Sequence, residues 1–210
     1  MPIKSNPIML HISRRDAVVR VLMPEGYKLG EVKSLERFLD WINQEKKSRE
    51  NKELTPLITM VDQIINAGLN YTKVDITDNL ITFYVYFEDY TDFDVIYSKM
   101  RHNEELKNSC SVDYYLTQKI WFPYSIDIKE DDNFISILGK ILNLNFGPKT
   151  RKFYEAIIPH SVPKVELARA SIKDNYLTLI IHSKDSVLLE DYEKELFNRH
   201  DKIKEGYLID

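Results

Sequence analysis

The chain has 210 residues, of which 43% are hydrophobic and 30% are charged, a composition that excludes a disordered chain and allows one large or two small folded units. Its formal net charge of −4 argues against non-specific binding to nucleic acid or to an anionic membrane, because both require a basic surface. Cys110 is the single cysteine, which excludes an internal disulfide and a cysteine-based metal cage, and no apolar run approaches the roughly 20 residues of a membrane span.

The first part of the chain predicts a β-hairpin followed by two helices. Residues 7–13 alternate between apolar and polar, residues 17–23 form a β-branched run, and the polar break between them predicts a turn. Apolar residues at i, i+3, i+4 and i+7 from Leu35 predict a helix with one buried face. Thr55 and Pro56 predict the start of the second helix, as a capping hydroxyl and a proline in the first turn.

A second hairpin follows, with a two-residue turn at 78–79 (Asp-Asn). This turn is expected to pair Ile76 with Ile81 and Val74 with Phe83 on one buried face. The opposite face is expected to carry three tyrosines, namely Tyr71, Tyr84 and Tyr86.

The same order of elements is predicted again in the second half. After a helix over residues 92–107, strands are predicted over 112–117 and 120–128. Two helices with apolar faces are then predicted to begin near Asn133 and Pro148.

The last hairpin is predicted to turn at 174–175, where Asp-Asn occurs again. Strict pairing around that turn puts Val165 and Leu167 on the face opposite to the other apolar residues. A β-bulge near Ala168 would return them to the apolar face. A final helix is predicted from about Asp185.

Each half is therefore predicted to contain a hairpin, two helices, a hairpin and a helix. Pro56 matches Pro148, and Lys73 matches Lys164, at nearly equal offsets, which favours an internal duplication over chance matches of common residues. The sequence predicts an α+β fold of antiparallel β-hairpins with packed helices. In it a ββααββα unit occurs at residues 1–108 and again at 109–210, as two units or around one joint core.

Thirteen tyrosines give the chain its most suggestive surface. Tyr71, Tyr84 and Tyr86 are expected on one sheet face, and tyrosine is enriched at interfaces because it buries area while keeping a polar end. The matching positions in the second half are Ile180 and His182. The alternative is that the tyrosines form cross-strand pairs that only stabilise the sheet.

We therefore expect a cytoplasmic, non-enzymatic binding protein with a macromolecular partner, in the first place another protein. Its composition associates it with the accessory proteins of phages or other mobile elements. No sequence motif of a catalytic, metal or cofactor site is present, so we assign no catalytic residue, metal ligand or cofactor.

Two alternatives remain. In the first, the protein is a nucleic-acid-binding pseudo-dimer that contacts phosphates through basic residues. The expected contacts are Arg14, Arg15, Lys149, Arg151 and Lys152. The last three begin a helix, where free N–H groups favour an anion, although a solvated first turn explains them as well.

In the second alternative, Asp113, Asp127 and Lys129 form the Asp…Asp-x-Lys pattern of metal-dependent nucleases. Two carboxylates would hold a divalent metal and the lysine would lie beside the attacking water. A strand would place Asp127 and Lys129 on one face. The solvent face of an edge strand is the simpler explanation of the same residues.

Overall fold

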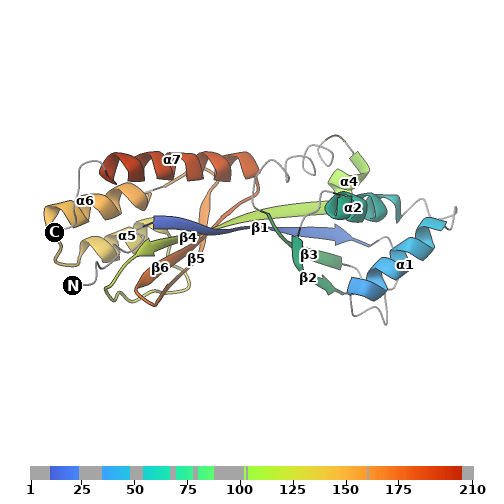
Figure 1. Cartoon of the computed structure of the whole chain (residues 1–210), viewed down its shortest axis with the longest axis horizontal. Helices are drawn as coiled ribbons and strands as arrows, with labels where there is room; N and C mark the ends of the chain where they lie inside the picture. The colour runs from blue at the N-terminus through green and yellow to red at the C-terminus, as the bar shows by residue number, and fades with distance from the viewer. Residues whose placement is uncertain are drawn as a thin grey trace, which may run out of the picture. The chain divides into compact units, whose positions relative to one another are not determined.

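The structure is a computed structural model that describes residues 10–23, 35–47, 54–66, 70–77, 80–87, 102, 104–159 and 161–204. The strands are β1 (Leu10–Leu22), β2 (Asn70–Ile76), β3 (Leu80–Tyr86), β4 (Cys110–Trp121), β5 (Glu166–Lys173) and β6 (Tyr176–Ser183). The helices are α1 (Leu35–Lys47), α2 (Thr55–Asn66), α4 (Glu104–Ser109), α5 (Phe134–Leu142), α6 (Pro148–Ile157) and α7 (Ser186–Lys204). This is the predicted α+β fold (Figure 1). Most of the helix predicted over 92–107 lies outside the described residues.

Within the described residues, each half has the order strand, helix, helix, strand, strand, helix. The hairpins predicted at the start of each half are wrong, because β1 and β4 are each one long strand. Neither predicted break contains Gly or Pro, the strongest turn formers, and Asp16 alone does not interrupt β1, so the backbone continues through both. The ββααββα unit is therefore corrected to βααββα, and the duplication itself stays a prediction.

The six strands form an antiparallel sheet in the order β2-β3-β1-β4-β6-β5. The β2–β3 pairing confirms the predicted register, with Val74 opposite Phe83 and Ile76 opposite Ile81. Strand β1 pairs with β3 and strand β4 with β6. Each hairpin thus joins the sheet through its second strand.

Both hairpins contain an irregularity at the same distance from their Asp-Asn turns. The register of β5 shifts between Leu167 and Arg169, which confirms the bulge expected at Ala168. The register of β2 shifts between Tyr71 and Lys73, and this bulge was not predicted. Counted from the two turns, Lys73 corresponds to Arg169, so the sequence match of Lys73 with Lys164 is wrong.

The turn of the second hairpin has the left-handed backbone that its sequence suggests. Asp174 has φ 54° and Asn175 has φ 62°, the positive values of a type I′ turn. Aspartate and asparagine tolerate this region better than other residues with a Cβ. The repeated Asp-Asn pair is therefore explained by the positive φ angles of this turn.

The chain divides into two compact units. Unit 2 is Arg15–Asp113, and unit 1 is Met1–Arg14 together with Tyr114–Asp210. The boundary we predicted falls between residues 108 and 109. Strands β1 and β4 each contribute residues to both units.

The core of unit 2 lies between its strands and helices α1 and α2. Strands β1 and β3 bury several apolar residues in this core, among them Val19, Phe83 and Val85. The Phe38 ring of α1 lies 6.0 Å from the Phe83 ring, centroid to centroid. The predicted start of α2 at Thr55 is confirmed.

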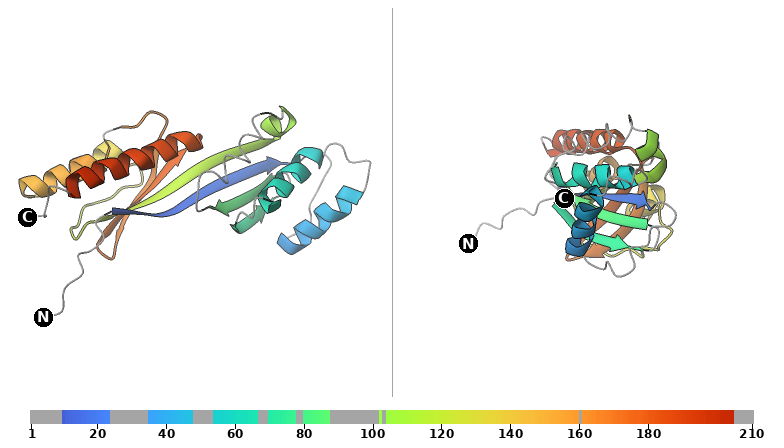
Figure 2. Two further views of the ribbon diagram at one scale, coloured as in Figure 1. Left: turned by 45° about the horizontal axis from the view of Figure 1, so that its top comes forward. Right: turned by 90° about the vertical axis from the view of Figure 1, so that its right-hand side faces the viewer.

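The core of unit 1 lies between β4–β6 and helices α5, α6 and α7, of which α6 and α7 lie side by side (Figures 1 and 2). The strands bury Leu116, Ile120 and Leu179. Helix α5 begins with a capping box, in which Asn133 accepts from the Ser136 backbone and Ser136 accepts from the Asn133 backbone. The apolar side chains that the helices bury are, in α5, Phe134, Ile137, Leu138 and Ile141; in α6, Phe153, Tyr154 and Ile157; and in α7, Leu189, Tyr192 and Leu196.

Candidate functional site

In both units the strands bury one face under helices and turn a second face away from them. We call the second face of unit 2 the tyrosine face. It carries Asp16, Val18, Arg20, Leu22, Lys73, Asp75, Thr82, Tyr84 and Tyr86. We call the second face of unit 1 the tryptophan face. It carries His11, Tyr115, Thr117, Lys119, Trp121, Glu166, Arg169, Ser171, Lys173, Tyr176, Thr178, Ile180 and His182.

Tyr84 is half-buried at the centre of a small polar network on the tyrosine face. The Lys73 ammonium lies 5.4 Å from the centroid of the Tyr84 ring and donates to Asp75 at 2.8 Å. Hydrogen bonds from Lys73 and then from Tyr84 lower the pKa of Asp75. The Asp75 hydrogen bond likewise raises the pKa of Lys73. The lysine, the aspartate and the tyrosine therefore hold each other across strands β2 and β3.

The rest of the tyrosine face carries a further ion pair and exposed apolar surface. Arg20 forms an ion pair with Asp113. Tyr86 is half-buried opposite Asp16, and the Leu22 side chain is 53% exposed at the end of β1. The face thus combines aromatic and aliphatic surface with charges that are bonded to one another.

Tyr71 does not share this face, which corrects the grouping we predicted. Its backbone lies opposite Val85, a residue of the helix-covered face. The cause is the bulge between Tyr71 and Lys73, because one extra residue reverses the side on which the preceding residues lie. The side chain of Tyr71 lies outside the described residues.

The tryptophan face has two aromatic clusters. At one end the rings of His11 and Trp121 both make edge-on contacts with the Tyr176 ring, at centroid distances of 5.9 and 5.5 Å. At the other end Tyr115 and His182 lie 5.1 Å apart, centroid to centroid. All five side chains are half-buried. Six residues of strand separate the clusters, which corresponds to about 20 Å.

Basic side chains lie between and beside these clusters. Lys119 is half-buried on β4, and Arg169 and Lys173 are exposed on β5. Burial, and then the charge of Lys119, lower the pKa of His11. Glu166 is the one carboxylate among the residues of this face, and its side chain lies 3.9 Å from His182.

The five basic residues of the predicted nucleic-acid surface have separate surroundings. Lys149 and Lys152 are exposed in the first turns of α6. Arg151 donates to the Leu142 carbonyl at 2.9 Å, so its guanidinium satisfies the carboxyl end of α5. Arg14 belongs to unit 1 and Arg15 to unit 2.

The nuclease arrangement depends on a strand that the structure does not contain. Asp127 and Lys129 lie in the loop that connects β4 to α5, so the prediction that a strand aligns them is wrong. Pro123 cannot donate to a sheet ladder, and the Lys129 N–H donates to the Asp132 carboxylate at 2.7 Å to form a turn. Among the described residues, no group of three His, Cys, Asp or Glu could hold a metal ion.

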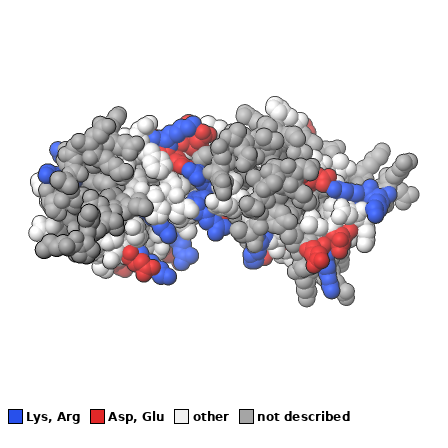
Figure 3. Space-filling model, viewed as in Figure 1, with Lys and Arg blue, Asp and Glu red and all other residues white. Residues whose placement is uncertain are grey.

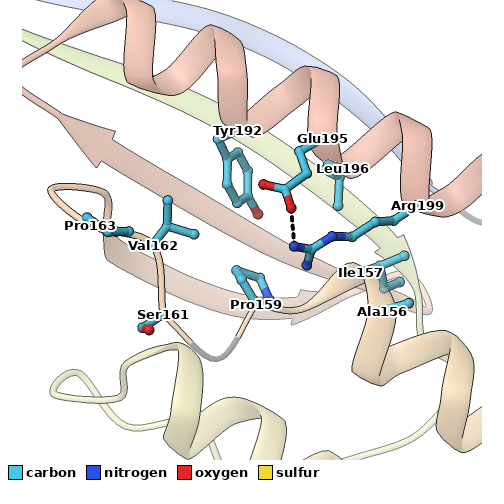
Figure 4. Close-up of a pocket in the computed structure, with 10 residues that line it drawn as sticks. All are labelled: Ala156, Ile157, Pro159, Ser161, Val162, Pro163, Tyr192, Glu195, Leu196 and Arg199. Carbon is cyan, nitrogen blue, oxygen red and sulfur yellow. Dashed lines mark hydrogen bonds and ion pairs between the residues drawn. The ribbon is translucent and has the colours of Figure 1, made fainter.

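A pocket of about 240 Å³ lies between α6, α7 and the loop before β5 (Figure 4). Tyr192 lines it and donates from its hydroxyl to the buried Gln118 Oε1 at 2.7 Å, while Gln118 Nε2 donates to the Ile157 carbonyl at 3.2 Å. Arg199 and Glu195 form an ion pair at its edge. The pocket is smaller than most ligand sites, and its Tyr192, Glu195 and Arg199 side chains already have partners within the protein, so we treat it as part of the scaffold.

A second cavity, of about 450 Å³, lies at the start of α5 and is lined by both acidic and apolar residues. Asp132 is its most constrained carboxylate. Lys140 donates to both of its oxygens, and this contact is the main reason why the pKa of Asp132 is lowered. This aspartate therefore anchors the loop to α5.

Surface charge elsewhere is mixed. Acidic and basic side chains lie next to each other at several places on the face shown in Figure 3. Lys46 pairs with Asp62, and Lys194 pairs with Glu190. No helix within the described ranges is both long and apolar enough to cross a membrane.

Sequence reasoning missed the tryptophan face. The sequence does contain a signal for this face: Trp121 and Lys119 are two residues apart on one strand, and Tyr176 lies on the strand that pairs with it. Dividing β4 into two predicted strands concealed it, because Lys119 was then read as part of a break.

No family model and no curated protein matches the sequence. Among solved structures, the chain is similar to the aspartokinase alpha and beta subunits, with 8% identity, coverage of 92% of this chain and 98% of that chain, and a TM-score of 0.28. It is also similar to the Clostridium acetobutylicum aspartate kinase (10% identity, 90% and 33% coverage, TM-score 0.27). A third is the ligand-free regulatory subunit of aspartate kinase from Thermus thermophilus (8% identity, 92% and 96% coverage, TM-score 0.25). These scores are too low to carry a functional argument.

Proposed function

We propose that the protein is a non-enzymatic, cytoplasmic binding protein that holds a protein partner against its tyrosine face. The observation that carries this proposal is the combination of half-buried Tyr84 and Tyr86 with exposed Leu22 on a face whose charges are paired. Protein interfaces favour tyrosine and are poor in unpaired charge at their centres.

The pairing of charges decides which partner this face suits. Arg20 is bonded to Asp113, and Lys73 to Asp75, so the face has little charge left to attract phosphates. Contact with apolar side chains of a partner would remove Leu22 and the tyrosine rings from water and so stabilise the complex. A polyanion would bind this face weakly, because its basic side chains are already paired.

The partner can be identified by affinity capture from the host and then purified for calorimetry with this protein. Leu22→Ser and Tyr86→Ala should each weaken the measured affinity by about 30-fold if they are central contacts, corresponding to about 2 kcal/mol. Val187→Ser is the matched control, because Val187 is 48% exposed on α7 and lies outside the tyrosine face.

Tyr84 needs a separate variant because it also contributes to the sheet. Tyr84→Phe keeps the ring under the Lys73 ammonium and removes only the hydroxyl that bonds to Asp75. Binding should survive this change. A purified partner whose affinity is unaffected by Leu22→Ser and Tyr86→Ala would contradict the proposal.

A further inference from the structure

We propose that the tryptophan face of unit 1 binds single-stranded RNA, with bases stacking on its two aromatic clusters and phosphates contacting its basic side chains. This inference is independent of the protein partner proposed for the tyrosine face. It also uses different residues from the basic set that the sequence suggested.

The aromatic arrangement is the first part of the argument. Strands β4, β6 and β5 lie side by side (Figure 1), and their register places Trp121 opposite Tyr176 and Tyr115 opposite His182. Each pair therefore lies on one level of the sheet, with half-buried rings on the side away from α5–α7. Sheet-face aromatics of this kind stack on unpaired bases, because every base has a π-face.

The charge of the face is the second part. Its described residues include three cations, Lys119, Arg169 and Lys173, and one carboxylate, Glu166, which lies beside His182. The face is thus locally basic although the whole chain has a net charge of −4. On the tyrosine face, by contrast, Arg20 and Lys73 are each bonded to an aspartate.

The central levels of the face distinguish RNA from DNA. Ser171 lies opposite Thr178, and Thr178 lies opposite Lys119. Two hydroxyl groups and an ammonium therefore form a row across three strands, between the aromatic clusters. These groups can donate to or accept from a ribose 2′-hydroxyl, which DNA lacks. We therefore assign RNA as the ligand.

Tryptophan fluorescence tests stacking directly, because the chain contains only Trp41 and Trp121. In Trp41→Phe, the emission comes from Trp121 alone. Addition of a short oligouridine at low salt should quench this emission saturably, whereas inorganic polyphosphate, which has no bases, should not. Absence of quenching by the RNA would overturn the proposal.

Anisotropy of a labelled oligouridine measures the affinity itself. Trp121→Leu should weaken binding by roughly 5- to 150-fold, as removal of a stacked ring does. The logarithm of the binding constant should fall with the logarithm of salt concentration at a slope of about −2, from three cations at roughly −0.7 each. The oligothymidine of equal length should bind more weakly, and equal or tighter binding of the DNA would refute the RNA assignment.

A matched pair of charge reversals locates the site. Arg169→Glu with Lys173→Glu should abolish detectable binding, while Lys149→Glu with Lys152→Glu, an equal change of net charge on α6, should leave the affinity within twofold of wild type. All four positions are exposed, and circular dichroism checks that both variants fold. Equal loss in both variants would show a non-specific charge effect and would contradict the proposal.

Discussion

Removal of one buried hydroxyl should measurably destabilise unit 1. Gln118 on β4 is fully buried, and its side chain joins three elements. Its Oε1 accepts from the Tyr192 hydroxyl of α7 at 2.7 Å, and its Nε2 donates to the Ile157 carbonyl at the end of α6 at 3.2 Å. This network is one of the polar connections between the helix pair and the sheet; the Tyr154 hydroxyl of α6 makes another, to the Trp121 carbonyl of β4 at 2.9 Å.

Tyr192→Phe keeps the ring and its stacking on Phe134 but leaves Gln118 Oε1 without its donor. A buried acceptor that loses its hydrogen bond costs about 1 to 3 kcal/mol. We expect a loss near the middle of this range, about 2 kcal/mol. For a chain of this length that corresponds to a fall in Tm of roughly 4 to 8 °C.

The measurement is urea unfolding followed by far-UV circular dichroism. Tyr124→Phe is the control, because it removes a hydroxyl from a side chain that is 42% exposed, and it should change the free energy of unfolding by less than about 0.5 kcal/mol. Gln118→Leu and the double variant with Tyr192→Phe complete a cycle, which should give a coupling of about 0.5 to 3 kcal/mol. A Tyr192→Phe variant as stable as Tyr124→Phe would refute the reasoning.

Three further results are expected. Asn175→Val should destabilise the protein by about 1 to 2 kcal/mol in urea unfolding, because Asn175 has φ 62° and a β-branched residue is strained there, whereas Asn175→Gly should be neutral or stabilising. Since Lys140 lowers the pKa of Asp132 below its usual 3.8, this carboxylate stabilises the fold above that pH and ceases to do so as the pH falls through its folded-state pKa. Asp132→Asn should therefore lower Tm more at pH 7 than at pH 2, and equal losses at both would contradict this. Burial raises the pKa of Cys110 to about 12, so the native thiol should react with a disulfide reagent at pH 8 at least about 100-fold more slowly than in urea.

The sequence predicts the local structure of this protein well where periodicity and turn chemistry agree. The buried positions of Phe38 and Ile42 in α1, the apolar face of α5 and the register of the β2–β3 hairpin are all confirmed. The bulge at Ala168 could be predicted because the apolar pattern of β5 changes face at that point. No such change marks the bulge in β2, where Tyr71 is amphipathic and fits either face, so the position of Tyr71 could not be predicted.

The long strands were harder to predict because their polar residues resemble turns. Arg14, Arg15 and Asp16 interrupt the apolar alternation of β1, and Gln118 does the same in β4. Gln118 is buried because Tyr192 and Ile157 satisfy its amide, and those partners are 74 and 39 residues away. A local pattern does not contain that information, and the tryptophan face was missed for the same reason.

The assignment of Met1–Arg14 and Tyr114–Asp210 to one unit has a consequence for synthesis of the protein. The Ser13 hydroxyl of β1 donates to the Thr117 carbonyl of β4, a residue that the ribosome adds 104 positions later. At about 5 to 20 residues per second, the first residues of β1 wait roughly 5 to 20 s for this neighbour. During that interval Arg15–Asp113 can fold, while the start of β1 stays exposed to chaperones or to a strand of another chain.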